Sequence, residues 1–119
     1  MFSENFEDLD TEDSIVLCGS NSYQQKYYYN PEFNMIPDSI KDELKIMCVR
    51  YTEEAGGIIT MEFDKNGSLK FKVRVADGDY MFDEIESGLK ISKYQKEKEE
   101  LVGEIELFYK VVFLGEEVV

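Results

Sequence analysis

Two runs of alternating apolar and polar residues, one on each side of an Asn-Gly pair, constrain this chain more than any other feature. In the first run, Ile59, Met61 and Phe63 alternate with polar residues, and the second run repeats the pattern with Leu69, Phe71, Val73 and Val75. A period of two is that of a β-strand with one buried face. The two runs therefore predict a pair of antiparallel strands.

The turn between these strands decides their register. A two-residue loop ending at Gly67 would set apolar residues of one strand opposite polar residues of the other. A three-residue loop ending at the same glycine keeps the faces apart and places Gly67 in the left-handed conformation of a bulge. We therefore expect Phe63 beside Leu69, with Glu62 opposite Lys70 on the exposed face, where an ion pair would help to fix the register.

The rest of the chain predicts two further strands and two helices. Aromatic and β-branched residues favour strands over 14–18 and 23–30, with a turn between them. Proline and acidic residues at the start, and a glycine pair at the end, favour a helix over 37–54. A second helical stretch is expected over 80–114, although residues 109–114 are apolar enough to form a strand instead.

These elements predict one α+β domain with the order β-β-α-β-β-α. Its mainly antiparallel four-stranded sheet would have both helices packed on one face. The domain is expected to span residues 14–119, after an acidic arm over residues 1–13. In that arm, repulsion between like charges favours a frayed segment over a short amphipathic helix. Gly88 and Gly103 mark positions where the long second helix could bend or split.

The charge balance argues against several classes of function. The 119 residues include 13 Lys and Arg against 26 Asp and Glu, with no His, for a net charge of -13. Such a field repels phosphate backbones and anionic lipids, so no binding to nucleic acid or membrane is expected. Without histidine, Ser-His-Asp triads, imidazole metal sites and most acid–base schemes are excluded. We expect no enzyme activity, no catalytic residue, no cofactor and no metal site.

The two cysteines predict no redox or metal chemistry. Cys18 and Cys48 are far apart in the chain and form no Cys-x-x-Cys motif, so we expect two reduced, largely buried thiols. The N-terminus does not resemble a secretory signal, and no apolar run is long enough to cross a membrane. A cytoplasmic location is therefore expected.

Two groups of residues are candidates for an interaction surface. The first is aromatic and lies on one predicted strand, where alternation sends Tyr28 to the face opposite Tyr27 and Tyr29. The second is a basic row on one face of another strand. The candidate residues are Tyr23, Tyr27, Tyr29, Lys70, Lys72 and Arg74. Each group also has a structural explanation, as a half-buried aromatic strand and as counter-charges to nearby acids.

Several segments of the chain resemble known families. The helix beginning at residue 37 and the segments 26–31, 40–49, 63–71 and 106–115 resemble an uncharacterised family of small acidic proteins from Gram-positive anaerobes. This family has no assigned activity, so the resemblance implies no catalytic residue.

A weaker similarity, over residues 25–85, is to the YezG-like immunity proteins, which neutralise polymorphic toxins. It rests on the order of an aromatic strand, an acidic helix, a strand, an Asp-x-x-Gly turn and a lysine-rich strand. The chain lacks the tryptophan often found before that hairpin, and its C-terminal segment has no counterpart in that family.

The function expected from the sequence is a non-enzymatic protein-binding module. Its partner would be an unidentified protein, basic in the case of toxin neutralisation, because an acidic surface steers a module onto a basic toxin. The contrasting hypothesis is a small-molecule-binding domain, which would need a cavity with convergent polar groups that the sequence does not show. A homo-oligomer is also left open, through the C-terminal stripe Leu101, Ile105, Phe108 and Val112.

Overall fold

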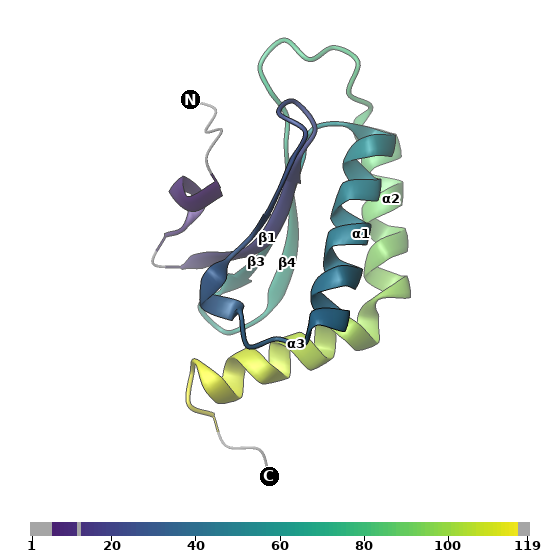
Figure 1. The fold of residues 1–119 in the computed structure, drawn as a ribbon. Helices are drawn as coiled ribbons and strands as arrows, with labels where there is room; N and C mark the ends of the chain where they lie inside the picture. Colours follow the sequence, from purple (N-terminus) through teal and green to yellow (C-terminus); the bar gives the residue numbers. More distant parts are fainter. Residues whose placement is uncertain (1–5, 12, 117–119) are drawn as a thin grey trace.

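The computed structural model describes residues 6–11 and 13–116 (Figure 1). Along the chain lie η1 (Phe6–Leu9), β1 (Ser14–Asn21), β2 (Lys26–Tyr29), η2 (Pro31–Phe33), α1 (Asp38–Ala55), β3 (Ile58–Asp64), β4 (Leu69–Arg74), α2 (Glu84–Glu97) and α3 (Glu99–Val112). The strands form one antiparallel sheet in the order β2-β1-β3-β4. Helices α1 and α2 lie side by side on one face, and α3 runs across their lower ends (Figure 1). The predicted α+β class and four-stranded antiparallel sheet are confirmed.

The β3–β4 hairpin has the register that its sequence pattern predicts. Phe63 pairs with Leu69, and Glu62 pairs with Lys70. Gly67 has a φ of 86°, the left-handed conformation expected of the bulge glycine. The alternation of apolar and polar residues was therefore sufficient to choose between the two loop lengths.

The first strand is longer than predicted. β1 does not stop at Cys18 but continues through Asn21, although Gly, Ser and Asn usually favour a turn. Tertiary contacts explain the difference. A Cβ atom added at Gly19 would lie 2.6 Å from the Phe6 ring, and the Ser20 hydroxyl is hydrogen-bonded to that of Thr52 at 2.8 Å. The residues read as a turn are thus needed inside the sheet.

The second strand is shorter than predicted. β2 covers only Lys26–Tyr29 of the range 23–30, because the residues before it form the turn that joins it to β1. In this turn, the side-chain oxygen of Asn21 accepts hydrogen bonds from the backbone N–H groups of Tyr23 and Gln24. Asparagine is typical of turns for this reason, but here it holds the turn from the last position of the strand.

The predicted second helix begins later than residue 80. Asp83 is the N-cap of α2, and its carboxylate accepts hydrogen bonds from the backbone N–H groups of Ile85 and Glu86. Asp77 and Asp79, which are also residue types that cap helices, lie in the loop before it. Residues 80–82 are therefore part of the β4–α2 loop.

The same segment is two helices and not one. The break falls at Lys98, with φ −108° and ψ 16°, whereas Gly88 and Gly103 both lie inside helices. Residues 109–112 are helical, so the alternative of a C-terminal strand is wrong. The chain turns at Lys98 because α3 must leave the direction of α2 to cross the end of the sheet (Figure 1).

The main core lies between the sheet and the three helices. The rings of Phe63 on β3 and Tyr109 on α3 stack with centroids 4.0 Å apart. Cys18 and Cys48 are fully buried and not in a disulfide, with their sulfur atoms 4.0 Å apart, so the predicted burial of both thiols is confirmed. Of the C-terminal stripe, Leu101, Ile105 and Phe108 belong to or pack against this core, whereas Val112 is exposed.

The opposite face of the sheet is partly covered by η1. The Phe6 ring is buried and stacks on Tyr28 of β2, with centroids 5.4 Å apart. The predicted acidic arm, residues 1–13, includes residues 1–5 and 12, which lie outside the described residues. Its described part packs on the sheet, unlike the frayed segment that charge repulsion predicted, because aromatic stacking and apolar burial favour the docked conformation.

Candidate functional site

The structure does not bring the six predicted surface residues together. Tyr27 and Tyr29 pack against the core on the helix-covered side of the sheet. The basic row of β4 lies on the opposite side, with Glu62. Tyr23 lies in the turn between β1 and β2. The predicted residues therefore occupy three separate places.

Tyr27 and Tyr29 are half-buried members of the core layer. Their predicted position on the face opposite Tyr28 is confirmed. The Tyr29 hydroxyl donates a hydrogen bond to the backbone oxygen of Phe33 at 2.6 Å, and burial raises the pKa of both hydroxyls. These contacts support the structural explanation of the aromatic strand.

Tyr23 joins two loops. Its hydroxyl donates a hydrogen bond to the Asp79 carboxylate at 2.6 Å and accepts one from the backbone N–H of Ala76 at 3.1 Å. Partial burial, then the bond to Asp79, raises the pKa of this hydroxyl. The β1–β2 turn is thereby attached to the β4–α2 loop.

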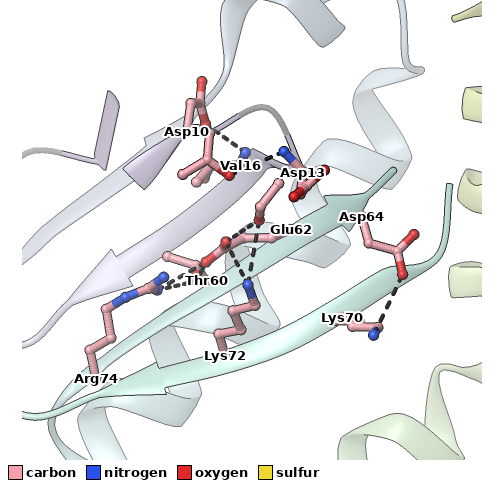
Figure 2. A network of polar contacts seen from close by, with 11 residues as sticks. Asp10, Asp13, Val16, Thr60, Glu62, Asp64, Lys70, Lys72 and Arg74 are labelled. Carbon is pink, nitrogen blue, oxygen red and sulfur yellow. Dashed lines mark hydrogen bonds and ion pairs between the residues drawn. The ribbon is translucent and has the colours of Figure 1, made fainter. Parts of the chain in front are cut away.

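The basic row surrounds a buried carboxylate. The Glu62 side chain is only 1% exposed, although it lies on the sheet face without helices. It accepts hydrogen bonds from the hydroxyls of Ser14, at 2.6 Å, and Thr60. Its oxygens also lie 3.3 Å from Lys72 Nζ and 2.9 Å from Arg74 Nη1 (Figure 2).

These contacts keep Glu62 ionised. Burial alone would raise its pKa, but the hydrogen bonds from Ser14, Thr60 and Arg74 and the charge of Arg74 act in the opposite direction, so the pKa is lowered. Lys70 and Lys72 are exposed as expected, but the expectation that Glu62 is exposed and forms an ion pair with Lys70 is wrong, although the two residues are register partners. Lys70 instead lies 3.5 Å from the Asp64 carboxylate (Figure 2). Lys72, two residues along β4 from Lys70, is the diagonal neighbour of Glu62 across the strands.

A surface that the sequence did not single out lies on the β4–α2 loop and the start of α2. Four apolar side chains are exposed there: Tyr80 by 95%, Met81 by 93%, Ile85 by 78% and Leu89 by 63%. Residues 75–89 also contain five acidic residues and no basic one. We call this set the acidic–apolar surface: Asp77, Asp79, Tyr80, Met81, Asp83, Glu84, Ile85, Glu86 and Leu89.

The orientation of α2 explains why these side chains are exposed. Ser87 is the buried residue in the first turns of α2, and its hydroxyl is hydrogen-bonded to that of Tyr51 on α1 at 2.5 Å. Ile85 and Leu89, four residues apart, share a side of the helix that this contact leaves in solvent. Apolar residues at helical spacing usually face the core, so the sequence pattern alone does not reveal this exposure.

The described residues form neither a metal-binding cluster nor a membrane-spanning helix. Within residues 6–11 and 13–116, His, Cys, Asp and Glu nowhere gather in a group of three or more that could hold a metal ion. In the same part of the chain, no helix combines the length and apolar character that a membrane span requires.

Comparison with known proteins gives a family but no activity. The family model of DUF6145, a family of unknown function, matches residues 14–117. No curated protein and no solved structure matches the chain.

Proposed function

We propose that this chain, which belongs to the DUF6145 family of unknown function, is a non-enzymatic protein-binding module. The observation that carries the proposal is the exposure of Tyr80, Met81, Ile85 and Leu89 on one loop and the helix that follows it. Apolar side chains on a monomer surface are usually scattered, and a contiguous group with a polar rim is typical of an interaction site. The acidic–apolar surface is therefore the proposed interface.

The charges around these side chains favour a basic partner. Asp77, Asp79, Asp83, Glu84 and Glu86 lie within the same stretch of chain, which contains no lysine or arginine between residues 75 and 89. Opposite charges raise the association rate and suppress binding to the wrong partner, while the apolar groups supply most of the affinity. The proposed partner is a protein segment with both basic and apolar side chains.

The most specific form of this proposal is toxin neutralisation in the cytoplasm. An immunity protein needs no catalytic group and no cofactor, and it acts by covering a surface of the toxin. The net charge of -13 would steer this chain onto a basic nuclease toxin. This form differs from the general one only in the partner, so identification of the partner decides between them.

The experiment is a quantitative affinity capture from host lysate with three forms of the tagged protein. We expect the wild type to retain one stoichiometric basic protein, and the double variant Ile85→Ala, Leu89→Ala to retain much less of it. The matched control is Leu107→Ala, because Leu107 is 52% exposed on α3, outside the proposed interface. Retention should also fall as salt is raised.

The same experiment can overturn the proposal. Equal retention of the partner by the wild type and the double variant would contradict the proposed interface. Equal losses with the double variant and with Leu107→Ala would show non-specific apolar adsorption. If the wild type retains no protein in stoichiometric amount, the module itself is rejected.

A further inference from the structure

A polar cleft lies between the β1–β2 hairpin and α1, and no residue of the acidic–apolar surface lines it. Its volume is about 800 Å³, within the range of small-molecule sites. The hairpin contributes Ser20, Asn21, Ser22, Gln25, Lys26 and Tyr27, and α1 contributes Lys45, Val49, Thr52 and Glu53. The sequence could not show this cleft, because it depends on the packing of α1 against one end of the hairpin.

One residue that lines the cleft, Asn21, holds a buried donor without a hydrogen bond among the described residues. Among the described residues, the buried side-chain atoms without a hydrogen bond are Asn21 Nδ2 and the Tyr27 hydroxyl. Asn21 is only 1% exposed, and its Oδ1 already accepts the N–H groups of Tyr23, at 2.9 Å, and Gln24, at 3.2 Å. A buried donor left unpaired costs about 1–3 kcal/mol. The Tyr27 hydroxyl lies against the thiols of Cys18 and Cys48 in the core, so Asn21 Nδ2 is the unpaired donor that suits a ligand with hydrogen-bond acceptors.

The charges of the cleft are opposite to those of the whole chain. Lys26 and Lys45 contribute two positive charges and Glu53 one negative charge, in a protein of net charge -13. Within the described part of the chain, neither lysine forms an ion pair, whereas Lys41, Lys70, Lys72 and Lys90 all do. Lys45 Nζ lies 5.9 Å from the centre of the Tyr27 ring. Two lysines without ion pairs among the described residues line the same cleft as Asn21, and this combination suits an anion.

The rim of the cleft also has an unusual backbone conformation. Gln25 has a φ of 53°, and among the described residues it is the one non-glycine residue with positive φ. Non-glycine residues in this conformation are strained, and such strain gathers at functional sites and tight turns. Gln25 places its side chain on the hairpin next to Lys26, where both line the cleft.

We propose that this cleft binds a small organic molecule that carries an anionic oxygen group. Lys26 and Lys45 supply the charge that attracts the anion, and Asn21 Nδ2 donates a hydrogen bond to an acceptor of the ligand. Val49 and the ring of Tyr27 provide apolar contact for its carbon skeleton. The anionic group is a carboxylate or a phosphate ester, since both present oxygens that lysine and amide donors recognise.

The test is a nuclear magnetic resonance titration of the ¹⁵N-labelled full chain. Citrate and glycerol 3-phosphate are the two probes, with sodium chloride at matched ionic strength as the reference. We expect saturable shifts in the Asn21 side-chain amide and in the backbone amides of Gln25 and Lys26. Binding of citrate but not of glycerol 3-phosphate would assign a carboxylate, and the reverse would assign a phosphate ester.

Variants decide whether the cleft is responsible. Lys45→Gln should weaken binding by about tenfold or more, because a charge-assisted hydrogen bond is lost. Lys96→Gln should leave binding unchanged, since Lys96 is exposed on α2 and, like Lys45, forms no ion pair within the described part of the chain. The double variant Ile85→Ala, Leu89→Ala should also bind normally, so failure of the proposed protein interface would leave this result unaffected.

Three outcomes would overturn the proposal. The first is that sodium chloride reproduces the shifts, which would show adventitious binding of ions only. The second is that Lys45→Gln and Lys96→Gln bind equally well. The third is that neither probe gives a saturable shift in the Asn21 amide, which would mean that water serves its unpaired donor.

Discussion

Two acidic regions of the molecule differ in how their charges are compensated. Glu62 is buried, and hydroxyl, ammonium and guanidinium groups surround its carboxylate (Figure 2). The acidic–apolar surface has five acids within residues 77–86 and no base from residue 75 to residue 89. Its apolar side chains are exposed as well. The charge of the first region is compensated within the folded chain, whereas we propose that a binding partner compensates the charges of the second.

We interpret the charge of Glu62 as structural and propose that the charges of the acidic–apolar surface act in binding. A buried ion pair constrains the fold, and removal of one partner is costly because the other remains unpaired. Exposed charges contribute little to stability but influence association. Substitutions in the two regions should therefore change different measurements: the free energy of unfolding for Glu62, and partner retention for Ile85 and Leu89.

The largest effect on stability is expected from Glu62→Gln. The amide removes the negative charge and points an NH₂ group at the hydroxyl and guanidinium donors that Glu62 now accepts from. We expect a loss of about 2–3 kcal/mol in the free energy of unfolding, measured by urea denaturation. The control is Glu104→Gln on α3, which is exposed and should change stability by less than about 0.5 kcal/mol. Equal losses of stability from the two substitutions would contradict a special structural role for Glu62.

The packing of η1 on the sheet face opposite the helices can be tested at Gly19. A Cβ atom there would lie 2.6 Å from the Phe6 ring and 2.8 Å from the backbone oxygen of Ile59. Gly19→Ala should therefore destabilise by about 1–3 kcal/mol, measured by thermal or urea unfolding. Gly103→Ala is the matched control, because nothing lies within 4 Å of its added Cβ inside α3, and it should stabilise by about 0.5–1 kcal/mol. Stabilisation by both variants would show that η1 does not pack as described.

The pH dependence of the Glu62 effect has a defined sign. The pKa of Glu62 is lowered in the folded state, so its contribution to stability is present above the unfolded pKa of about 4.3 and is lost as the pH falls through the folded value. The difference in unfolding free energy between wild type and Glu62→Gln should be constant near neutral pH and narrow below about pH 4. Unfolding curves at several pH values measure it. A difference that widens in acid would contradict an ionised, stabilised carboxylate.

The smallest effect on stability is expected from Ile85→Ala, Leu89→Ala. Both side chains are largely exposed on α2, so the free energy of unfolding should change by less than about 0.5 kcal/mol. Thermal unfolding of this variant and wild type checks the expectation. A loss above about 2 kcal/mol would show that these side chains pack in the folded chain, and would remove the reason to regard the surface as an interface.

The parts of the fold that could be predicted are those with a strong local sequence pattern. The β3–β4 register could be predicted because a slip of one residue would have exposed Phe63. The extension of β1 through Gly19 could not, because it depends on Phe6 packing over the sheet from a distant part of the chain. The start of α2 was missed because both Asp79 and Asp83 are plausible caps, and only the position of α2 against α1 selects the second.

The candidate sites were harder to predict than the fold. The alternation of Tyr27, Tyr28 and Tyr29 was correct, but the sequence could not show which side α1 would cover. Ile85 and Leu89 have the spacing of a core stripe, and their exposure follows from Ser87 facing Tyr51. The lysine-rich strand next to Glu62 did indicate that basic residues compensate its charge. The burial of the Glu62 carboxylate could not be predicted from the sequence.

The most direct test of the protein-binding account is hydrogen–deuterium exchange of the whole chain, with and without the captured partner. This measurement reports every described element at once and does not depend on a choice of variants. The account predicts that the partner slows exchange in the β4–α2 loop and the first turns of α2, within residues 77–89, with little change in β3 and β4. Protection confined to the β1–β2 hairpin or to the β4 basic row, with unchanged exchange over residues 77–89, would contradict it.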